Sequence, residues 1–336
     1  MLAARYYGPG DIRVEEVDAP VCRPGQVLVR VAYAGVCGSD LHNYRKGMFM
    51  TYAPETMGHE FAGTVAEVGE GVTGFTPGQK VIGDPRVPCG KCAWCKEEKY
   101  NLCPKLGFIG EVKPGCFAPY LLMGPEQLLV IPPELPLQEA AVAEPLGVAV
   151  HIIKEAGLTA LKPTDTVAVI GAGPIGLLSL MALKALSKAS VIVADISAER
   201  LLLAEKLGAN ETYVNTDRIE DDSAAAAIEA VGLGVTLQEA LRILEPRGRL
   251  AMAGLYEDKC ILDPNPIVTK ELRLYGINTY NKADLQEAVE LIHQGKVNVK
   301  QIVTDIVPLI ETERIFQDLD KKAKTCAKVL IAMPEE

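Results

Sequence analysis

The sequence predicts an α/β protein that combines a β-rich domain with a second domain built on a doubly wound parallel sheet. Three observations support this fold class. The first third carries short apolar alternations separated by glycine turns, strand and helix patterns alternate from residue 166 to about residue 277, and a glycine-rich turn joins one of these strands to a helix. At 336 residues the chain also exceeds the usual size of one domain.

The expected elements follow the periodicity of the apolar residues. A helical pattern in residues 137–156 ends at Gly157, a suitable cap. The tail is expected to begin with a helix that reaches residue 293, and we assign this tail to the first domain. The expected strands are residues 12–17, 27–32, 61–68, 166–170, 302–307 and 328–332. The predicted domains are residues 1–147 with 278–336, which are β-rich, and residues 148–277, which form the parallel sheet.

The composition and the charge exclude several classes of protein. Acidic residues outnumber basic ones by 44 to 34, which gives a net charge of −10, and no basic cluster stands out beyond residues 321–324. The apolar runs are shorter than the roughly 20 residues of a membrane span, and residues 1–17 mix charges into an alternating pattern unlike a signal peptide. We therefore expect a cytoplasmic protein with no nucleic-acid or membrane partner.

Four of the nine cysteines, Cys89, Cys92, Cys95 and Cys103, have the spacing of a metal site. Four thiolates can close a tetrahedron around Zn²⁺ and leave no position for a substrate, so this lobe, residues 88–104, is expected to bind a structural zinc. An iron–sulfur cluster and disulfides are the alternatives. The seven-residue last gap differs from the three-residue gap of the bacterial cluster motif, and a cytoplasmic compartment disfavours disulfides.

A dinucleotide site is predicted at the turn between a buried strand and an apolar helix. The strand at residues 166–170 leads into Gly171-Ala-Gly173-Pro174-Ile175-Gly176, whose glycines allow a tight turn and a close approach of the pyrophosphate to the helix start. The next strand ends at Asp195, where a carboxylate would bind the adenosine ribose and repel the extra phosphate of NADP, so NAD is the expected cofactor. The residues expected to contact NAD are Gly171, Gly173, Pro174, Ile175, Gly176, Asp195 and Arg200.

Candidate ligands of a second metal ion flank the four-cysteine lobe. Cys37 and the pair His59-Glu60 precede the lobe, and Glu144 follows it. A thiolate, an imidazole and a carboxylate suit Zn²⁺, and three protein ligands leave the fourth position open to water or substrate, as in catalytic sites. Taken singly, each of these residues is better explained by a structural role. His151, seven residues after Glu144, is expected to be structural.

The order of these motifs resembles that of the zinc-dependent medium-chain dehydrogenases. Cys37-x-Ser39-x-x-His42, Gly58-His59-Glu60, the four-cysteine lobe, Glu144-Pro145 and the glycine turn occur in the same order and span nearly the whole chain. The forms Cys-Gly-Ser-Asp-x-His and Glu-Pro-Leu are most similar to the polyol branch, which includes sorbitol and butanediol dehydrogenases. The resemblance implies a GroES-like catalytic domain, a Rossmann domain, two Zn²⁺ per chain and NAD.

The resemblance also implies a role for each site residue. Cys37 and His59 would bind the catalytic zinc, and Glu60 or Glu144 would supply the acidic ligand directly or through water. Ser39 would take the alcohol proton and pass it through the cofactor ribose to His42. Because zinc lowers the pKa of bound water to about 7, a similar effect on an alcohol would favour hydride transfer to the nicotinamide. Relatives assemble as dimers or tetramers, so a homodimer or homotetramer is expected.

The expected reaction is the reversible, NAD-linked oxidation of a small secondary alcohol, which would be a polyol, a sugar alcohol or a diol, to the ketone. An L-threonine 3-dehydrogenase is the alternative within the family, and a non-catalytic NAD-binding structural or sensing protein is the alternative from another class. The chain departs from the family pattern at two places. Residues 215–228 leave room only for a shortened helix, and Thr279 precedes Tyr280 where sorbitol-type relatives tend to carry an arginine.

Overall fold

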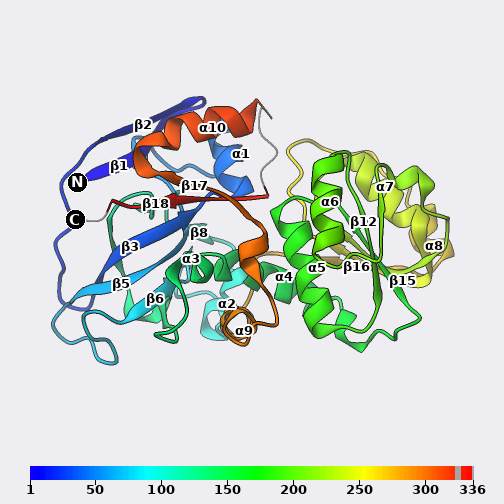
Figure 1. The fold of residues 1–336 in the computed structure, drawn as a ribbon, viewed down its shortest axis with the longest axis horizontal. Coiled ribbons are helices and arrows are strands. Elements are labelled where there is room, and N and C mark those ends of the chain that lie inside the picture. Colours follow the sequence, from blue (N-terminus) through cyan, green and yellow to red (C-terminus); the bar gives the residue numbers. More distant parts are fainter. Residues whose placement is uncertain (322–326, 335–336) are drawn as a thin grey trace. The chain divides into compact units, whose positions relative to one another are not determined.

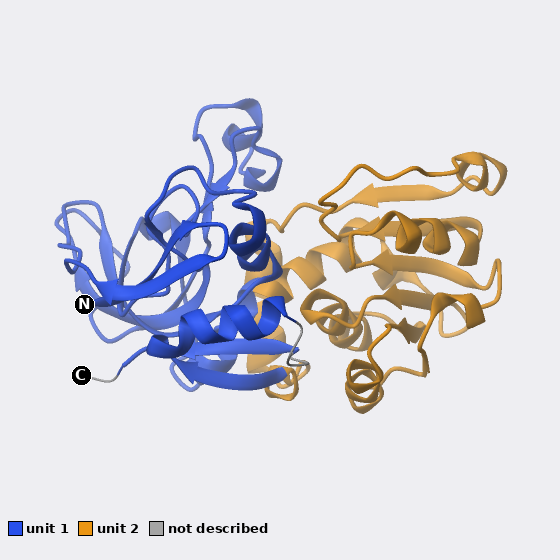
Figure 2. Cartoon of the chain, turned by 90° about the horizontal axis from the view of Figure 1, so that it is seen from above, with its two compact units in different colours: residues 1–144, 303–336 blue, residues 145–302 orange. Residues whose placement is uncertain are grey.

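The computed structural model describes residues 1–321 and 327–334, and most of the lysine cluster at residues 321–324 lies outside these ranges. The chain forms two compact units, which Figure 2 colours separately. Unit 1 comprises Met1–Glu144 and Val303–Glu336, and unit 2 comprises Pro145–Ile302. Within the described ranges, no helix has both the length and the apolar character that a membrane crossing requires.

Unit 1 is built mainly from β-strands (Figure 1). Its larger sheet has the order β10-β6-β5-β3-β18-β17, and β9 also pairs with β3. A smaller sheet has the order β2-β1-β4, and β7 pairs with β8. The strands are β1 (Leu2–Gly8), β2 (Asp11–Glu16), β3 (Val27–Gly35), β4 (Glu55–Thr56), β5 (Glu60–Val68), β6 (Lys80–Gly83), β7 (Arg86–Val87), β8 (Gly107–Phe108), β9 (Tyr120–Met123), β10 (Leu128–Val130), β17 (Val303–Pro308) and β18 (Lys328–Ala332).

Alternation along the strands of unit 1 places one face in a core. In β3, Val27, Val29 and Val31 are buried, whereas Arg30 between them is exposed. The three valines pack in one cluster with Phe61 and Phe117, and the removal of this apolar surface from water stabilises the fold. The strands predicted at residues 12–17, 27–32 and 61–68 are confirmed as β2, β3 and β5, with ends that shift by one to three residues.

The helices of unit 1 are short and lie beside the sheets. They are α1 (Gly38–Lys46), α2 (Ala93–Lys96), α3 (Leu137–Ala140) and α10 (Thr312–Asp320), with 3-10 turns η1 (Tyr100–Leu102), η2 (Pro125–Gln127) and η6 (Leu309–Glu311). Helices α1 and α10 contact each other through Tyr44 and Phe316, whose ring centroids are 5.6 Å apart. This contact fixes α1, which follows Cys37 directly.

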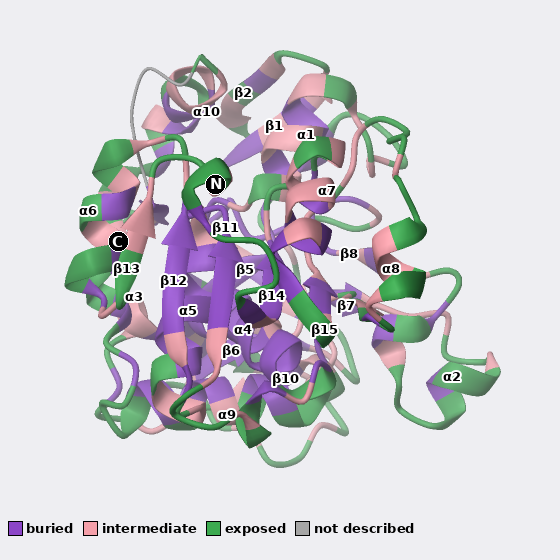
Figure 3. Ribbon diagram, turned by 90° about the vertical axis from the view of Figure 1, so that its right-hand side faces the viewer, coloured by how far each residue is buried: buried purple, intermediate pink, exposed green. Residues whose placement is uncertain are grey.

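Unit 2 is built on six parallel strands in the order β13-β12-β11-β14-β15-β16. The strands are β11 (Thr166–Ile170), β12 (Ser190–Ala194), β13 (Glu211–Tyr213), β14 (Ala224–Glu229), β15 (Leu244–Met252) and β16 (Arg273–Gly276). The chain moves outward from β11 to β13 and then continues on the other side of β11 as β14. The central strands are almost fully buried (Figure 3), as parallel strands between helices should be. The predicted doubly wound sheet is confirmed.

The connection from β13 to β14 differs from the prediction, because the shortened helix expected in residues 215–228 does not form. Residues 214–223 contain only the 3-10 turn η4 (Thr216–Arg218), since so short a connection cannot hold two loops and a helix. Arg242 donates hydrogen bonds to the carbonyl oxygens of Thr216 and Ile219, at 2.7 and 2.9 Å. Residues 224–227, four consecutive alanines, instead start β14, which pairs with β11 and β15.

The helical segment predicted at residues 137–156 is two helices, α3 and α4, and Gly157 follows with a φ of +65°. The helices between Ala143 and His293 are α4 (Ala143–Glu155), α5 (Pro174–Leu186), α6 (Ala198–Lys206), α7 (Gly234–Ile243), α8 (Asn265–Thr269) and α9 (Lys282–His293), and unit 2 also contains the 3-10 turns η3 (Leu158–Ala160) and η5 (Val299–Gln301) in addition to η4. Helix α7 contacts β14 and β15, and α5 contacts β11.

Residues 278–302 pack within unit 2, whereas the sequence interpretation placed them in the β-rich domain. The physical reason is the buried apolar face of α9, together with a charge cluster between α4 and α9. His151 Nδ1 lies 2.7 Å from one oxygen of Asp284, and Lys154 Nζ lies 2.8 Å from the other. Asp284 has no exposed surface and His151 is 5% exposed, so the pair joins the two helices in the interior. His151 thus has the structural role expected for it.

Candidate metal centres and dinucleotide site

Cys37, His59 and Glu60 come together where β3 ends and β5 begins. The sheet register pairs Gly35, the last residue of β3, with Glu60, the first residue of β5. Cys37 lies two residues beyond β3 and caps α1, and His59 immediately precedes β5. The ligand atoms of these three side chains lie within 4.8 Å of one another. One Zn²⁺ could therefore contact a thiolate, an imidazole and a carboxylate here.

The burial and hydrogen bonding of these side chains show whether the site suits a cation. His59 is 4% exposed and Glu60 is 1% exposed. Among the described residues, Oε1 of Glu60 has no hydrogen-bond partner, and Nδ1 of His59 has only the Asp40 carboxylate at 3.5 Å. Such atoms are costly in a protein interior unless something binds them. The side chains present therefore fit the zinc that the resemblance implies.

Asp40, which the sequence analysis did not assign, lies beside His59. Its Oδ2 accepts a hydrogen bond from the amide of Cys37 at 2.9 Å, and its Oδ1 is 3.5 Å from His59 Nδ1. Burial lowers the pKa of His59, but the Asp40 carboxylate and Cys37 together raise that pKa well above its ordinary value. A carboxylate in this position orients a ligand histidine, so Asp40 links the helix cap to the metal site.

Lys328 is a second residue that the sequence analysis missed. It is the first residue of β18, and its ammonium forms an ion pair with Glu60 and donates to the carbonyl oxygen of Val36 at 2.9 Å. Burial lowers the pKa of Lys328, yet Glu60 and Cys37 raise it more, so the net pKa lies above the usual value. Gly35 leaves space for this pair, because a β-carbon there would collide with the Glu60 carboxylate.

The other predicted residues of the catalytic site lie on α1 and α4. Glu144 is buried in the first turn of α4, and its charge contributes to the raised pKa of Lys328. Among the described residues, the side chains close enough to share an ion with Cys37 and His59 include Glu60 but not Glu144. Ser39 and His42 are half-buried and three residues apart on α1, so they share one face of that helix.

Two further buried groups surround the metal ligands. Burial raises the pKa of Glu111 to about 7, a shift that His59 opposes and Asp40 reinforces. Asn43 donates a hydrogen bond to Glu111 at 3.3 Å. The Cys116 thiol donates to the carbonyl oxygen of Glu60 at 3.6 Å, and burial raises its pKa, which makes it an unreactive thiol.

The four-cysteine lobe forms a compact cluster of sulfur atoms. All four Sγ atoms lie within 4.8 Å of one another, and those of Cys92 and Cys95 are 3.4 Å apart. A tetrahedral zinc ion with bonds of about 2.3 Å to sulfur holds its sulfurs about 3.8 Å apart. The observed sulfur separations therefore fit a single ion better than a cluster of several irons. Each of these cysteines is free rather than disulfide-bonded. Hydrogen bonds from the amides of Lys91 and Cys92 lower the pKa of Cys89 to about 6, which favours the thiolate.

The glycine turn of unit 2 has the geometry of a dinucleotide site. Gly171 has a φ of +98°, and a β-carbon at Gly176 would collide with the carbonyl oxygen of Gly171. Pro174 begins α5, so the turn leads directly into a helix start. Asp195 follows β12, and its carboxylate accepts hydrogen bonds from the amides of Ala172 and Ser197 at 2.6 and 2.8 Å. Arg200 Nη1 is 3.9 Å from Asp195.

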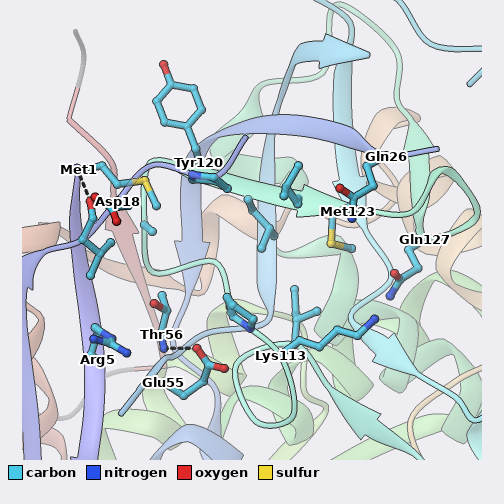
Figure 4. A pocket seen from close by; sticks show the side chains of 18 of the residues that line it. Met1, Arg5, Asp18, Gln26, Glu55, Thr56, Lys113, Tyr120, Met123 and Gln127 are labelled. Atoms are coloured by element: carbon cyan, nitrogen blue, oxygen red, sulfur yellow. Dashed lines mark hydrogen bonds between the residues drawn. The ribbon is translucent and has the colours of Figure 1, made fainter. Parts of the chain in front are cut away.

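A cavity of about 500 Å³ lies elsewhere on unit 1 (Figure 4). Met1, Arg5, Lys113, Tyr120 and Gln127 are among the residues that line it. None of the predicted metal ligands lines this cavity. It is therefore separate from the metal centres.

Comparison with known proteins identifies the family. Residues 23–133 match the alcohol dehydrogenase GroES-like domain, and residues 174–294 match the zinc-binding dehydrogenase domain. The chain is 35% identical to the probable D-xylulose reductase A of Aspergillus fumigatus over 97% of this chain and 94% of that protein. It is 34% identical to the sorbitol dehydrogenase of Bacillus subtilis over 98% of this chain and 97% of that protein.

A solved structure shows the same likeness over both units. The 2R,3R-butanediol dehydrogenase of Bacillus subtilis matches with a TM-score of 0.89 and 32% identity, and the match covers 99% of each chain. The expected GroES-like and Rossmann domains are thus confirmed, as is the resemblance to the polyol branch. The chain belongs to the zinc-binding alcohol dehydrogenase family.

Proposed function

We propose that this protein catalyses the reversible, NAD-linked oxidation of a small secondary alcohol, a polyol or diol, to the ketone. The observation that carries the proposal is the group of Cys37, His59 and Glu60, whose ligand atoms lie within 4.8 Å of one another. Three protein ligands leave one position on a zinc ion for the substrate oxygen. The named activities of relatives, which act on D-xylulose, sorbitol and butanediol, support this substrate class.

Each residue of the site has a distinct part in this proposal. When bound, zinc supplies a Lewis acid that lowers the pKa of the alcohol hydroxyl. Cys37 and His59 bind the ion, Asp40 orients His59, and Glu60 or Glu144 completes the set directly or through water. Ser39 accepts the alcohol proton and His42, on the same face of α1, delivers it to solvent.

The two units divide the cofactors between them in this proposal. Unit 1 binds both zinc ions, one at Cys37 and one in the four-cysteine lobe, and unit 2 binds NAD at the glycine turn. Asp195, which follows β12, binds the ribose hydroxyls and disfavours NADP in this proposal. Assembly as a homodimer or homotetramer rests on the resemblance.

The test is a panel of sugar alcohols, diols and L-threonine assayed with NAD, with the absorbance of the reduced cofactor as the readout. Wild-type protein should oxidise polyols or diols, and metal analysis should find about two zinc ions per chain. His59→Ala should lower turnover at least about 1000-fold, with NADH binding retained. His293→Ala, which alters an exposed histidine on α9, is the matched control.

The same assay decides between the alternatives. Oxidation of L-threonine in preference to every polyol would support the threonine dehydrogenase reading. NADH binding with one zinc per chain and no turnover would support a non-catalytic NAD-binding protein. Full activity of His59→Ala would contradict the proposed role of the metal.

A further inference from the structure

Glu229 is a fully buried carboxylate at the carboxyl end of β14. Its Oε1 accepts hydrogen bonds from the amides of Val231 and Gly232, both at 2.9 Å, and from Thr236 Oγ1 at 2.8 Å. Its Oε2 accepts a hydrogen bond from the Tyr256 hydroxyl at 2.8 Å. All four donors are neutral groups. Burial of a carboxylate is costly, and these four bonds offset that cost without a cation.

The donors belong to two loops on the same edge of the sheet. Val231 and Gly232 lie in the β14 loop, residues 230–233, which leads into α7, where Thr236 forms part of the first turn. Tyr256 lies in the β15 loop, residues 253–264, which leads into α8. The main-chain oxygen of Glu229 also accepts from the amides of Ala253 and Gly254 at 2.9 and 3.0 Å. Glu229 therefore ties the two loops together.

The β14 loop lies next to the glycine turn, and the β15 loop lies beside the β14 loop. The sheet register pairs Ile170, which precedes Gly171, with Glu229, and a β-carbon at Gly171 would lie 2.7 Å from Val231. The strand order reverses between β11 and β14, and ligands of such sheets bind at the carboxyl ends of the strands at that point. Val231 and Leu255 are 41% and 48% exposed, so each loop presents apolar surface suited to the flat rings of a dinucleotide.

We propose that Glu229 is a positioning residue for the dinucleotide, and that its bond to Tyr256 makes the β15 loop part of the cofactor site. This inference rests on the proposed function of unit 2. The close approach of the loops supports it, because a β-carbon at Gly254 would collide with the main chain of Gly232. The two glycines allow the loops to meet over the Glu229 carboxylate. Glu229 itself does not touch the reacting atoms, and it acts through the loops.

Tyr256→Phe tests the proposal, because it removes one hydrogen bond and leaves the other three on Glu229. NADH binding to the full-length protein is measured by fluorescence titration, and kcat and KM for NAD are measured with the best alcohol of the panel. The dissociation constant for NADH and the KM for NAD should rise about tenfold, the effect of one hydrogen bond to a charged group. The kcat at saturating NAD should stay within about twofold.

Tyr7→Phe is the matched control, because Tyr7 donates to Glu15 at the same distance of 2.8 Å in unit 1. It should leave NADH binding unchanged. Tyr256→Phe protein that melts at a lower temperature but binds NADH like the wild type would overturn the inference and leave Glu229 as a stabiliser of the sheet. Absence of NADH binding to the wild type would overturn the proposed function itself, and this inference with it.

Discussion

The ammonium of Lys328 lies against the carboxylate of Glu60, and both side chains are only 1% exposed. The pair connects β18, near the end of the chain, with β5, and it lies over Gly35 of β3. A buried ion pair adds little net stability, but removal of one partner leaves a charge uncompensated. Lys328 therefore balances the charge of a candidate metal ligand.

Lys328→Met should destabilise the metal-free protein by about 3–5 kcal/mol, because Glu60 would keep a buried charge without its partner. Bound zinc would compensate that charge, so the loss should be smaller in zinc-loaded protein. Urea unfolding with a chelator and with zinc measures both values. Lys328→Arg, which keeps the charge, should recover part of the loss, and equal losses with and without zinc would contradict the argument.

Glu111→Gln should change how stability depends on pH. The folded-state pKa of Glu111 is about 7 and its ordinary value is 4.5, so the fold favours the protonated form. The contribution of Glu111 to the free energy of unfolding is therefore greatest below pH 4.5. It falls by about 3 kcal/mol as the pH rises from 4.5 through 7. The difference in unfolding free energy between wild type and variant, measured in chelator-treated protein at pH 5 and pH 8, should follow this decline. A difference independent of pH would show that Glu111 does not titrate in this range.

Cys103→Ser should remove the zinc of the four-cysteine lobe and leave the other ion in place, since the two ligand groups share no residue. Metal analysis should then find about one zinc per chain. The lobe should become sensitive to proteases, because a structural zinc site is coupled to folding. Cys22→Ser, which changes a cysteine outside both groups, should keep two ions. Loss of both ions from Cys103→Ser would show that the sites depend on each other.

Asp195→Ala should weaken the preference for NAD over NADP. Asp195 is fixed at the carboxyl end of β12 by hydrogen bonds from the amides of Ala172 and Ser197. Without its charge, the repulsion of a 2′-phosphate is lost, and the ratio of kcat/KM for the two cofactors should fall about tenfold or more. Asp165→Ala is the control, because Asp165 also accepts from a main-chain amide but lies before β11. An unchanged ratio for Asp195→Ala would argue against the assigned role.

The sequence predicted those parts of the site that are local in the chain. The glycine turn, the four cysteines and the pair His59-Glu60 are each defined by short spacings, and the structure places each group together. Lys328 gave no such signal, because only the pairing of β18 with β3 brings it to Glu60. The sequence gives no signal for Glu229 either, since its partner Tyr256 lies on another loop.

The prediction for residues 215–228 failed for a different reason. Residues 224–228 pair with strands on both sides as part of β14, which leaves too few residues for a helix between β13 and β14. The assignment of residues 278–302 failed because apolar periodicity shows that a helix forms but does not show its packing partner. The contact of Asp284 with His151 is one of those that join α9 to unit 2, and it links residues 133 positions apart.

Unit 1 is made from two separate stretches of sequence, with unit 2 between them, and this order matters during synthesis. Residues 145–302 leave the ribosome as one continuous stretch, so the parallel sheet can fold while translation continues. The strand that carries Lys328 is made only after that stretch, and β3 lacks this neighbour until then. Cys37 and His59 therefore emerge beside a sheet that still lacks β18, and Lys328 joins Glu60 only after the residues of unit 2 have been made.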